Sequence, residues 1–329
     1  MLKQTVLPKW KGFNLLDMFT VRSMGEFQEN DFKWIRDWGF DFVRLATCYT
    51  LWINNDDVYD INEEGLKRID RAVELGDKYN IHVNLSFHRG PGFSVNPERK
   101  EPFNLWKDQA ALDAFCFHWE LMTNRYKGIS SDKLSFNMIN EPKTPDGDMS
   151  VEDHKRVMAE CVNKIRAIDK DRLCILDGLG WGTIPCPELI ELGAAQSCRA
   201  YNPSGVSHYK ASWVGGENWP EPSWPDTFWG ERWDKDRLYQ YYKPWAELAT
   251  QGIGVHCGEG GAHCHTPHHV VLAWLKDVLD ILDEFNIGLA LWNFRGSFGI
   301  LDSGRDDVDY EDWHGHKLDR KLLELLMKY

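Results

Sequence analysis

The sequence alternates eight times between a short apolar run, which predicts a strand, and a longer run with helical spacing. The predicted strands are 11–19, 41–48, 81–88, 134–140, 172–178, 205–209, 253–259 and 287–293. The predicted helices cover about 26–38, 63–79, 108–127, 151–168, 187–195, 235–251, 267–285 and 316–328. This alternation favours parallel strands joined by helical crossovers. Eight such units in 329 residues predict an α/β fold of the (β/α)8 TIM barrel type, as a single domain over residues 1–329.

The helix predictions depend on apolar residues that recur on one helical face, as Leu66, Ile69 and Val73 do. An open, doubly wound sheet is the alternative fold for an alternating chain. It would need a glycine-rich phosphate-binding turn after the first strand, and residues 14–17 (NLLD) do not provide one. The barrel is therefore favoured.

In a barrel of this kind the active site lies at the carboxyl ends of the strands. The side chains that end the predicted strands are Arg44, His88, Asn140, Glu141, Asp177, His208, Tyr209, Glu259, Trp292 and Asn293. Two of them are glutamates, and a pair of carboxyl groups suits glycoside hydrolysis. One protonates the leaving oxygen, while the other attacks the sugar carbon or activates water.

The segments around these two glutamates resemble glycoside hydrolase family 5, the cellulase-like family of clan A. The resemblance extends from residue 11 to residue 293, and its most specific parts are 136–142 (FNMINEP) and 255–261 (VHCGEGG). Further matches, in the same order along the chain, are Val43-Arg44-Leu45, His88, His208 and Trp292.

The resemblance implies a retaining mechanism, with Glu259 as nucleophile and Glu141 as acid/base residue. The supporting residues that it implies are Arg44, His88, Asn140, His208 and Tyr209. Arg44 would pair with Glu259, and Asn140 would bind the sugar 2-hydroxyl. On strand six the family usually reads His-x-Tyr, so either Tyr209 or His208 would tune the carboxyl groups. Trp292 would lie under the reacting sugar, with Asn293 beside it in the substrate site.

Tryptophan is unusually frequent, with 16 residues. Five of them fall in one long connection, at about 210–234, together with three prolines. A connection of this length in a compact domain usually serves binding. Because flat aromatic rings stack on flat ligands, we predict sugar contacts for Trp213 in this loop and for Trp181 at the end of strand five.

Residues 256–269 contain several His and Cys side chains, which could bind a metal ion. Their spacing fits no closed zinc pattern and they surround Glu259, so we interpret them as sugar-contacting residues and a helix N-terminus. We interpret the acidic residues at 302–309 as a solvated loop and not as a calcium site. The sequence therefore predicts no metal and no cofactor. The eight cysteines form no CxxC pair and lie mostly in apolar stretches, which indicates reduced core residues.

The formal net charge is −13, which disfavours binding to nucleic acid. No run approaches 18 apolar residues, so no membrane span is predicted, and we expect a monomer. The first residues lack the apolar region of a signal peptide. We therefore expect a cytoplasmic protein as the sequence stands, or a secreted one if a native signal has been removed.

These patterns together predict an endo-β-1,4-glucanase that acts on soluble β-glucans or oligosaccharides. An exo-acting β-glucosidase, a β-mannanase and a xyloglucanase remain alternatives on the same scaffold, because fold does not choose among them. A non-catalytic glycan-binding barrel is the alternative from another class. The presence of both Glu141 and Glu259 argues against it.

Overall fold

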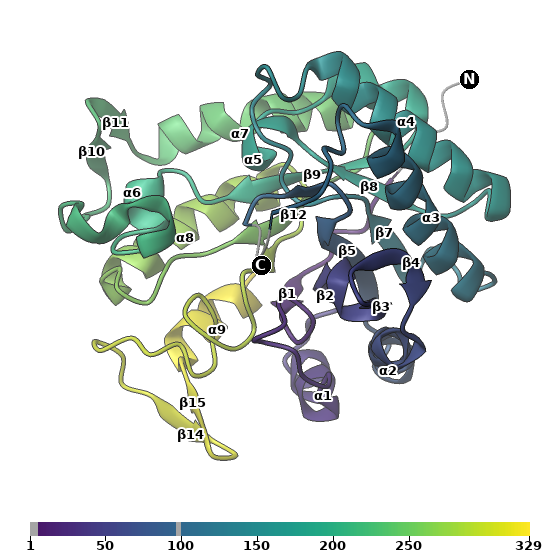
Figure 1. The fold of residues 1–329 in the computed structure, drawn as a ribbon. Helices are drawn as coiled ribbons and strands as arrows, with labels where there is room; N and C mark the ends of the chain where they lie inside the picture. The colour runs from purple at the N-terminus through teal and green to yellow at the C-terminus, as the bar shows by residue number, and fades with distance from the viewer. Residues whose placement is uncertain (1–5, 97–99) are drawn as a thin grey trace.

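The computed structural model describes residues 6–96 and 100–329, and eight parallel strands form a nearly closed barrel at its centre (Figure 1). In chain order these strands are β1 (Gly12–Leu15), β2 (Phe42–Cys48), β5 (His82–Gly90), β7 (Leu134–Asn137), β8 (Cys174–Asp177), β9 (Ala195–Ala200), β12 (Val255–Gly260) and β13 (Ala290–Leu291). Each strand pairs with the next in chain order, and β13 pairs with β1. A bridge between Cys257 and Leu289 brings the last two together. The predicted (β/α)8 barrel is confirmed.

Helices cover the outside of the barrel (Figure 1). They are α1 (Glu29–Asp37), α2 (Glu63–Tyr79), α3 (Gln109–Arg125), α4 (Val151–Ile168), α7 (Lys235–Thr250), α8 (His268–Glu284) and α9 (Arg320–Met327). Side chains cap the first turns of α2, α4, α7 and α9, as Asn62 does for α2 and Ser150 for α4, where Asp153 completes a capping box. The predictions for 63–79 and 151–168 match these helices residue for residue.

Short elements decorate the loops. The strand pairs are β3 (Ile53–Asn54) with β4 (Asp57–Ile61), β10 (Asp226–Phe228) with β11 (Glu231–Trp233), and β14 (Glu311–Trp313) with β15 (His316–Leu318), while β6 (Phe93–Ser94) pairs with β5. The short helical turns are η1 (Tyr49–Trp52), α5 (Leu179–Gly182), η2 (Pro187–Leu192), α6 (Ser204–Ser207), η3 (Ser212–Val214) and η4 (Gly216–Asn218). The Trp-rich connection thus has secondary structure of its own.

The prediction for strand six was wrong. The sixth strand is β9, at 195–200, whereas residues 205–209 include the helical turn α6, and the predicted helix 187–195 is only the 3-10 turn η2. Ser197 and Arg199 point to one side of β9 and Gln196 to the other, and all three are buried but polar. A polar buried strand lacks the apolar run by which the other strands were recognised.

The amino-terminal end of the barrel is filled by stacked rings. Trp10 stacks on His82 with ring centres 3.8 Å apart, and Phe42 lies 4.5 Å from His256. Burial lowers the pKa of His82 to about 4 and that of His256 to about 3, so both rings are neutral core residues. This apolar plug leaves the opposite end of the barrel for polar side chains.

All eight cysteines are free, and every one except Cys264 is buried, as the sequence predicted. Within the described residues, no helix is both long and apolar enough to cross a lipid bilayer.

The close approach of β1 and β2 gives a prediction about stability. A Cβ atom on Gly12 would lie 1.7 Å from the carbonyl oxygen of Phe42, so Gly12→Ala must push the two strands apart. We expect the free energy of unfolding to fall by about 3 kcal/mol or more, measured by urea denaturation followed by tryptophan fluorescence. Gly147→Ala is the control, because nothing lies within 4 Å of its Cβ position. Equal effects of the two substitutions would contradict the close approach.

Candidate active site

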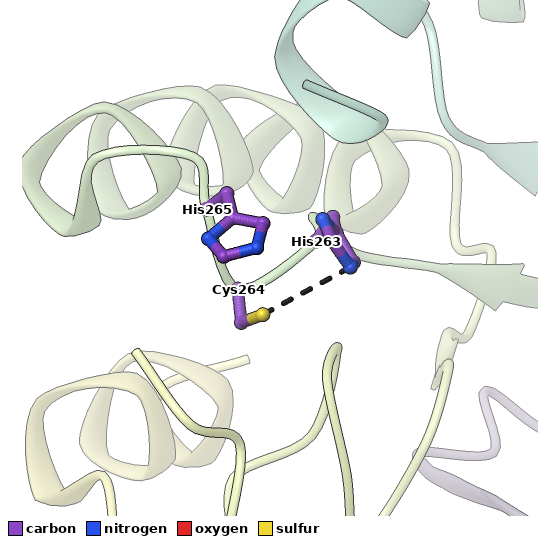
Figure 2. Close-up of side chains that lie close together, drawn as sticks. All are labelled: His263, Cys264 and His265. Carbon is purple, nitrogen blue, oxygen red and sulfur yellow. Dashed lines mark hydrogen bonds between the residues drawn. The ribbon is translucent and has the colours of Figure 1, made fainter. Parts of the chain in front are cut away.

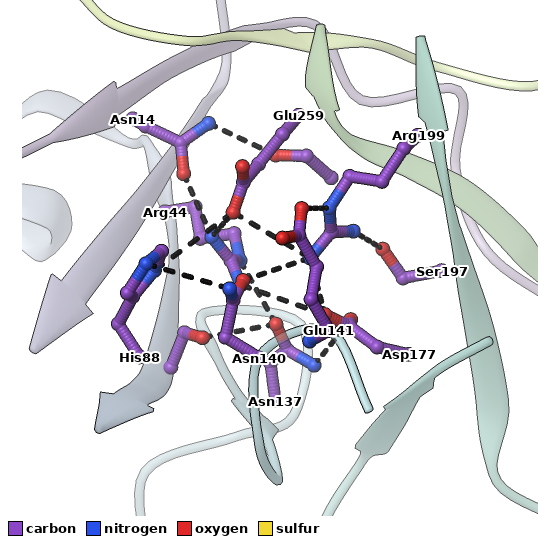
Figure 3. Close-up of polar contacts among 12 residues, drawn as sticks. Asn14, Arg44, His88, Asn137, Asn140, Glu141, Asp177, Ser197, Arg199 and Glu259 are labelled. Atoms are coloured by element: carbon purple, nitrogen blue, oxygen red, sulfur yellow. Dashed lines mark hydrogen bonds and ion pairs between the residues drawn. The ribbon is translucent and has the colours of Figure 1, made fainter. Parts of the chain in front are cut away.

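The polar side chains predicted at the strand ends converge at the carboxyl end of the barrel, where a cleft of about 900 Å³ opens. Glu259 lies on β12, and Glu141 follows β7 by four residues (Figure 3). Both carboxyl groups line the cleft, together with His88 and Trp292. The barrel therefore brings together two glutamates that are 118 residues apart in the sequence.

Glu259 is surrounded by hydrogen-bond donors. Arg44 Nη1 donates to its Oε1 at 2.6 Å, and the Tyr201 hydroxyl donates to its Oε2 at 3.0 Å. Arg199 Nη2 lies 3.5 Å from Oε1. Positive charge and direct donors favour the ionised form of a carboxyl group. Glu259 is therefore held in place by one ion pair, one hydroxyl donor and a second nearby guanidinium group.

Glu141 has a different environment. Its backbone adopts a φ of 50°, which is unusual for a residue with a side chain, and its amide donates to Asp177 Oδ2 at 2.9 Å. Its Oε1 accepts from Arg199 Nε at 2.8 Å. Burial above all, with the charges of Glu259 and Asp177, raises the pKa of Glu141 to about 8 against the opposing effect of Arg199. At neutral pH this carboxyl group holds a proton.

The side-chain amides of asparagine residues accept hydrogen bonds from the guanidinium groups of Arg44 and Arg199. Arg44 donates to Asn14 Oδ1 at 3.0 Å, to Asn137 Oδ1 at 2.8 Å and to Asn140 Oδ1 at 2.8 Å. Arg199 Nη2 donates to the same Asn140 oxygen at 2.9 Å. The side-chain oxygen of Asn140 thus links Arg44, which contacts Glu259, to Arg199, which contacts Glu141.

His88 lies between the carboxylate and the aromatic floor of the cleft. Its Nδ1 is 4.0 Å from Glu259, and its ring stacks on Trp292 with centres 5.4 Å apart. Burial first, and then Arg89, Arg44 and Arg199, hold the pKa of His88 well below its usual range. The imidazole is therefore neutral.

The corrected position of strand six changes which tyrosine donates a hydrogen bond to Glu259. The described residue that donates to Glu259 from this part of the chain is Tyr201, directly after β9, and not Tyr209, which lies after α6 beside the ammonium group of Lys210. His208 lines the cleft, with its ring 5.0 Å from that of Tyr201. Burial first, and then the charge of Glu259, raise the pKa of Tyr201 well above its usual range, so its hydroxyl keeps its proton.

Sequence reasoning therefore missed Tyr201 and Arg199, and it did not select Asp177 as a site residue. A signal for the first two was present. Residues 199–201 (RAY) have the spacing of the family's His-x-Tyr, with Arg in the position of His. The prediction of strand six at 205–209 leaves this RAY segment outside any strand, so the match to the family pattern is not apparent.

The aromatic residues predicted to bind sugar lie around the cleft. Trp181, Trp213, Trp292 and Asn293 all line it, and Trp181 and Trp213 are 52% and 53% exposed. Trp181 adopts a φ of 60° between two glycines, and its amide donates to the carbonyl oxygen of Pro142, next to Glu141. This left-handed turn holds its ring in solvent. Of the other loop tryptophans, Trp219 also lines the cleft, whereas Trp233 is buried.

Two groups of side chains among the described residues have the composition of a metal site. His263, Cys264 and His265 lie on the turn after β12, with their ligand atoms within 4.8 Å of one another (Figure 2). His154, Cys186 and Glu188 form a more buried group between α4 and η2. Neither group includes Glu141 or Glu259.

Comparison with known proteins supports the chemistry of this site. The family model for cellulase (glycosyl hydrolase family 5) matches residues 3–297. Endoglucanase C of Acetivibrio thermocellus is 27% identical over 312 residues, which cover 86% of this chain and 88% of that protein. Cellodextrinase A of Ruminococcus flavefaciens is 25% identical over 272 residues, covering 79% and 76%. A crystal structure described as that of a glycoside hydrolase is 40% identical, with a TM-score of 0.93 over 97% of this chain and 99% of that one.

A barrel with two glutamates at its carboxyl end defines the class of glycoside hydrolases. The chain belongs to glycosyl hydrolase family 5, and it is a glycoside hydrolase.

Proposed function

We propose that this enzyme cleaves β-1,4-linked glucan chains or their oligosaccharides, as an endoglucanase, by retaining double displacement. The observation that supports the mechanism is the unequal state of the two glutamates in one cleft. Arg44 and Tyr201 donate hydrogen bonds to Glu259, while burial raises the pKa of Glu141 to about 8. An ionised nucleophile and a protonated acid are what the first step requires.

In the first step, Glu259 attacks the anomeric carbon and forms a covalent glycosyl-enzyme. The bond from that carbon to the leaving oxygen breaks, and the Glu141 proton passes to this oxygen. In the second step, water attacks the same carbon and gives a proton to Glu141, and Glu259 departs as a carboxylate. Arg199 contacts both glutamates and thus remains a partner of the ionised group throughout.

The aromatic residues suggest how the sugar chain lies. Trp292 stacks against His88 at the bottom of the cleft, beside Glu259, and we assign it to the sugar that reacts. Trp181 is held next to the segment of Glu141, so we assign it to the leaving-group side. Trp213 and Trp219, from the Trp-rich connection, line another part of the same wall. The names of the relatives, endoglucanase and cellodextrinase, support a glucan substrate.

The roles of the two glutamates can be separated by substitution. Glu259→Ala should lower turnover by about 10⁴-fold or more on every substrate, because no nucleophile remains. Glu141→Ala should lower turnover of cello-oligosaccharides by about 10²- to 10⁴-fold. It should affect aryl glycosides with activated leaving groups far less, and added azide should restore activity. The measurement is steady-state kinetics, with Glu152→Ala on the exposed start of α4 as control. Equal losses on both substrates without azide rescue would rule out the acid/base role.

The substrate proposal is tested by a panel of β-glucans, mannans, xyloglucan and aryl glycosides, with the products separated by chain length. We expect the highest kcat/KM on β-1,4-glucans and an early mixture of oligosaccharides, which is the mark of internal cleavage. Release of a single short product from the first time points would show exo action instead of endo action. That outcome would mean that the Trp-rich connection blocks one end of the cleft. Preference for mannan would overturn the glucan assignment.

A further inference from the structure

We propose that Asp177 and Arg199 are positioning residues that together hold Glu141 in its reactive orientation and determine the pH at which it loses its proton. This proposal rests on the acid/base role proposed for Glu141. It concerns two residues, on β8 and β9, whose side chains belong to the wall of the barrel.

The three residues form a closed ring of contacts (Figure 3). Arg199 Nε donates to Glu141 Oε1 at 2.8 Å, and Arg199 Nη2 donates to Asp177 Oδ2. The same Asp177 oxygen accepts from the Glu141 amide at 2.9 Å. The side chain and the backbone of Glu141 are thus fixed by one ion pair, and the backbone is fixed in the left-handed region that few residues adopt.

The ion pair itself is rigid and dry. The side chain of Asp177 is 0% exposed and that of Arg199 is 1% exposed. Asn137 Nδ2 donates to Asp177 Oδ1 at 2.9 Å, and Arg199 Nη1 donates to Ser197 Oγ at 3.0 Å. A buried ion pair contributes little to stability compared with apolar residues of the same size. A role in the site explains its presence better than a role in folding.

The balance of charge explains how the pair acts on the proton. Among the described residues, two guanidinium groups, Arg44 and Arg199, face three carboxyl groups, Glu141, Asp177 and Glu259. The other titratable groups around them, His88 and Tyr201, are neutral. With all three carboxyl groups ionised, this buried group of side chains would carry a net charge of −1, which burial disfavours. Arg44 forms ion pairs with Asp177 and Glu259, whereas Glu141 has Arg199 as its cationic partner in the described part of the chain, and burial raises the pKa of Glu141 to about 8.

The test uses two substitutions that should act in opposite directions. Asp177→Asn removes a negative charge, so Glu141 should lose its proton more easily. The alkaline limb of kcat/KM on cello-oligosaccharides should then move to lower pH by about one unit. Arg199→Gln removes a positive charge, so the same limb should move to higher pH. Arg199→Lys keeps the charge and should leave the limb near its original position.

Thermal unfolding of each variant verifies that it folds, and if either charge-removing variant does not fold, the other decides. Loss of turnover with an unmoved limb would show a merely structural role and would overturn the proposal. Failure of the proposed function looks different, because Glu141→Ala would then keep its activity on cello-oligosaccharides.

A separate observation concerns the turn that follows β12. We infer that His263, Cys264 and His265 form a binding site for a thiophilic divalent ion such as Zn²⁺. Their ligand atoms lie within 4.8 Å of one another, and His263 Nε2 is 3.9 Å from Cys264 Sγ (Figure 2). Tetrahedral zinc with Zn–S and Zn–N bonds of about 2.3 and 2.0 Å needs ligand atoms about 3.3 to 3.5 Å apart, so these side chains must rotate inward when the ion binds.

Neighbouring residues orient the His263 ring and fix the backbone of this turn. His263 Nδ1 lies 3.2 Å from the carbonyl oxygen of Tyr209, which places the ring proton on Nδ1 and leaves the lone pair of Nε2 toward the sulfur. The buried guanidinium of Arg305 donates to the carbonyl oxygens of Ala262, His263 and Thr266, and so fixes the backbone. The His263 ring touches the edge of Trp213 with centres 5.2 Å apart. A bound ion would therefore stiffen the turn that contacts Trp213, a residue that lines the cleft.

The probe is Zn²⁺ itself, titrated against a chromophoric chelator in the absence of substrate. We expect one ion per chain at micromolar concentration, and at least tenfold weaker binding in Cys264→Ser and in His265→Ala. His269→Ala is the control, because its exposed ring lies nearby on α8 outside the cluster. Binding that is absent, or equally strong in Cys264→Ser and the wild type, would overturn the site.

Discussion

The buried contacts between two arginines and three carboxyl groups are the interaction on which the site depends. Arg44 lies on β2 and Arg199 lies on β9. Both contact the carboxyl group of Glu259 and the side-chain amide oxygen of Asn140. Charges removed from water are costly unless they are paired and hydrogen-bonded, so each group must be held by several partners. The amides of Asn14, Asn137 and Asn140 provide these partners. The result is a preorganised set of donors around Glu259 and a buried Glu141 whose pKa is raised to about 8.

The barrel makes this arrangement possible by separating its two ends. Stacked rings around Trp10 and Phe42 close the amino-terminal end and exclude water. The carboxyl end is then free to carry polar side chains on short, rigid strands. Residues on strands are positioned more exactly than residues on loops, which suits chemistry that depends on contacts of about 3 Å.

The loops contribute exposed aromatic rings beside the cleft. The left-handed turn at Trp181 and the short helical turns around Trp213 present exposed rings beside the cleft. These rings add apolar surface to a cleft that also holds the two carboxyl groups. Of those two groups, Glu259 lies on a strand, whereas Glu141 lies four residues after the end of β7.

The sequence by itself determined the eightfold repeat, the two glutamates and most of the residues around them, because strand ends in a parallel barrel meet at one place whatever lies between them. It also predicted that Arg44, His88, Asn140 and Trp292 lie near those glutamates, since all four match motifs of the family in the right order. It could not place strand six, because the buried face of β9 is polar and gives no apolar signal. Only the tertiary structure decided that Tyr201 donates to Glu259, that Arg199 and Asp177 surround Glu141, and that burial raises the pKa of Glu141. These properties arise from distances between strands and from the exclusion of water, and neither is encoded in the local pattern of the chain.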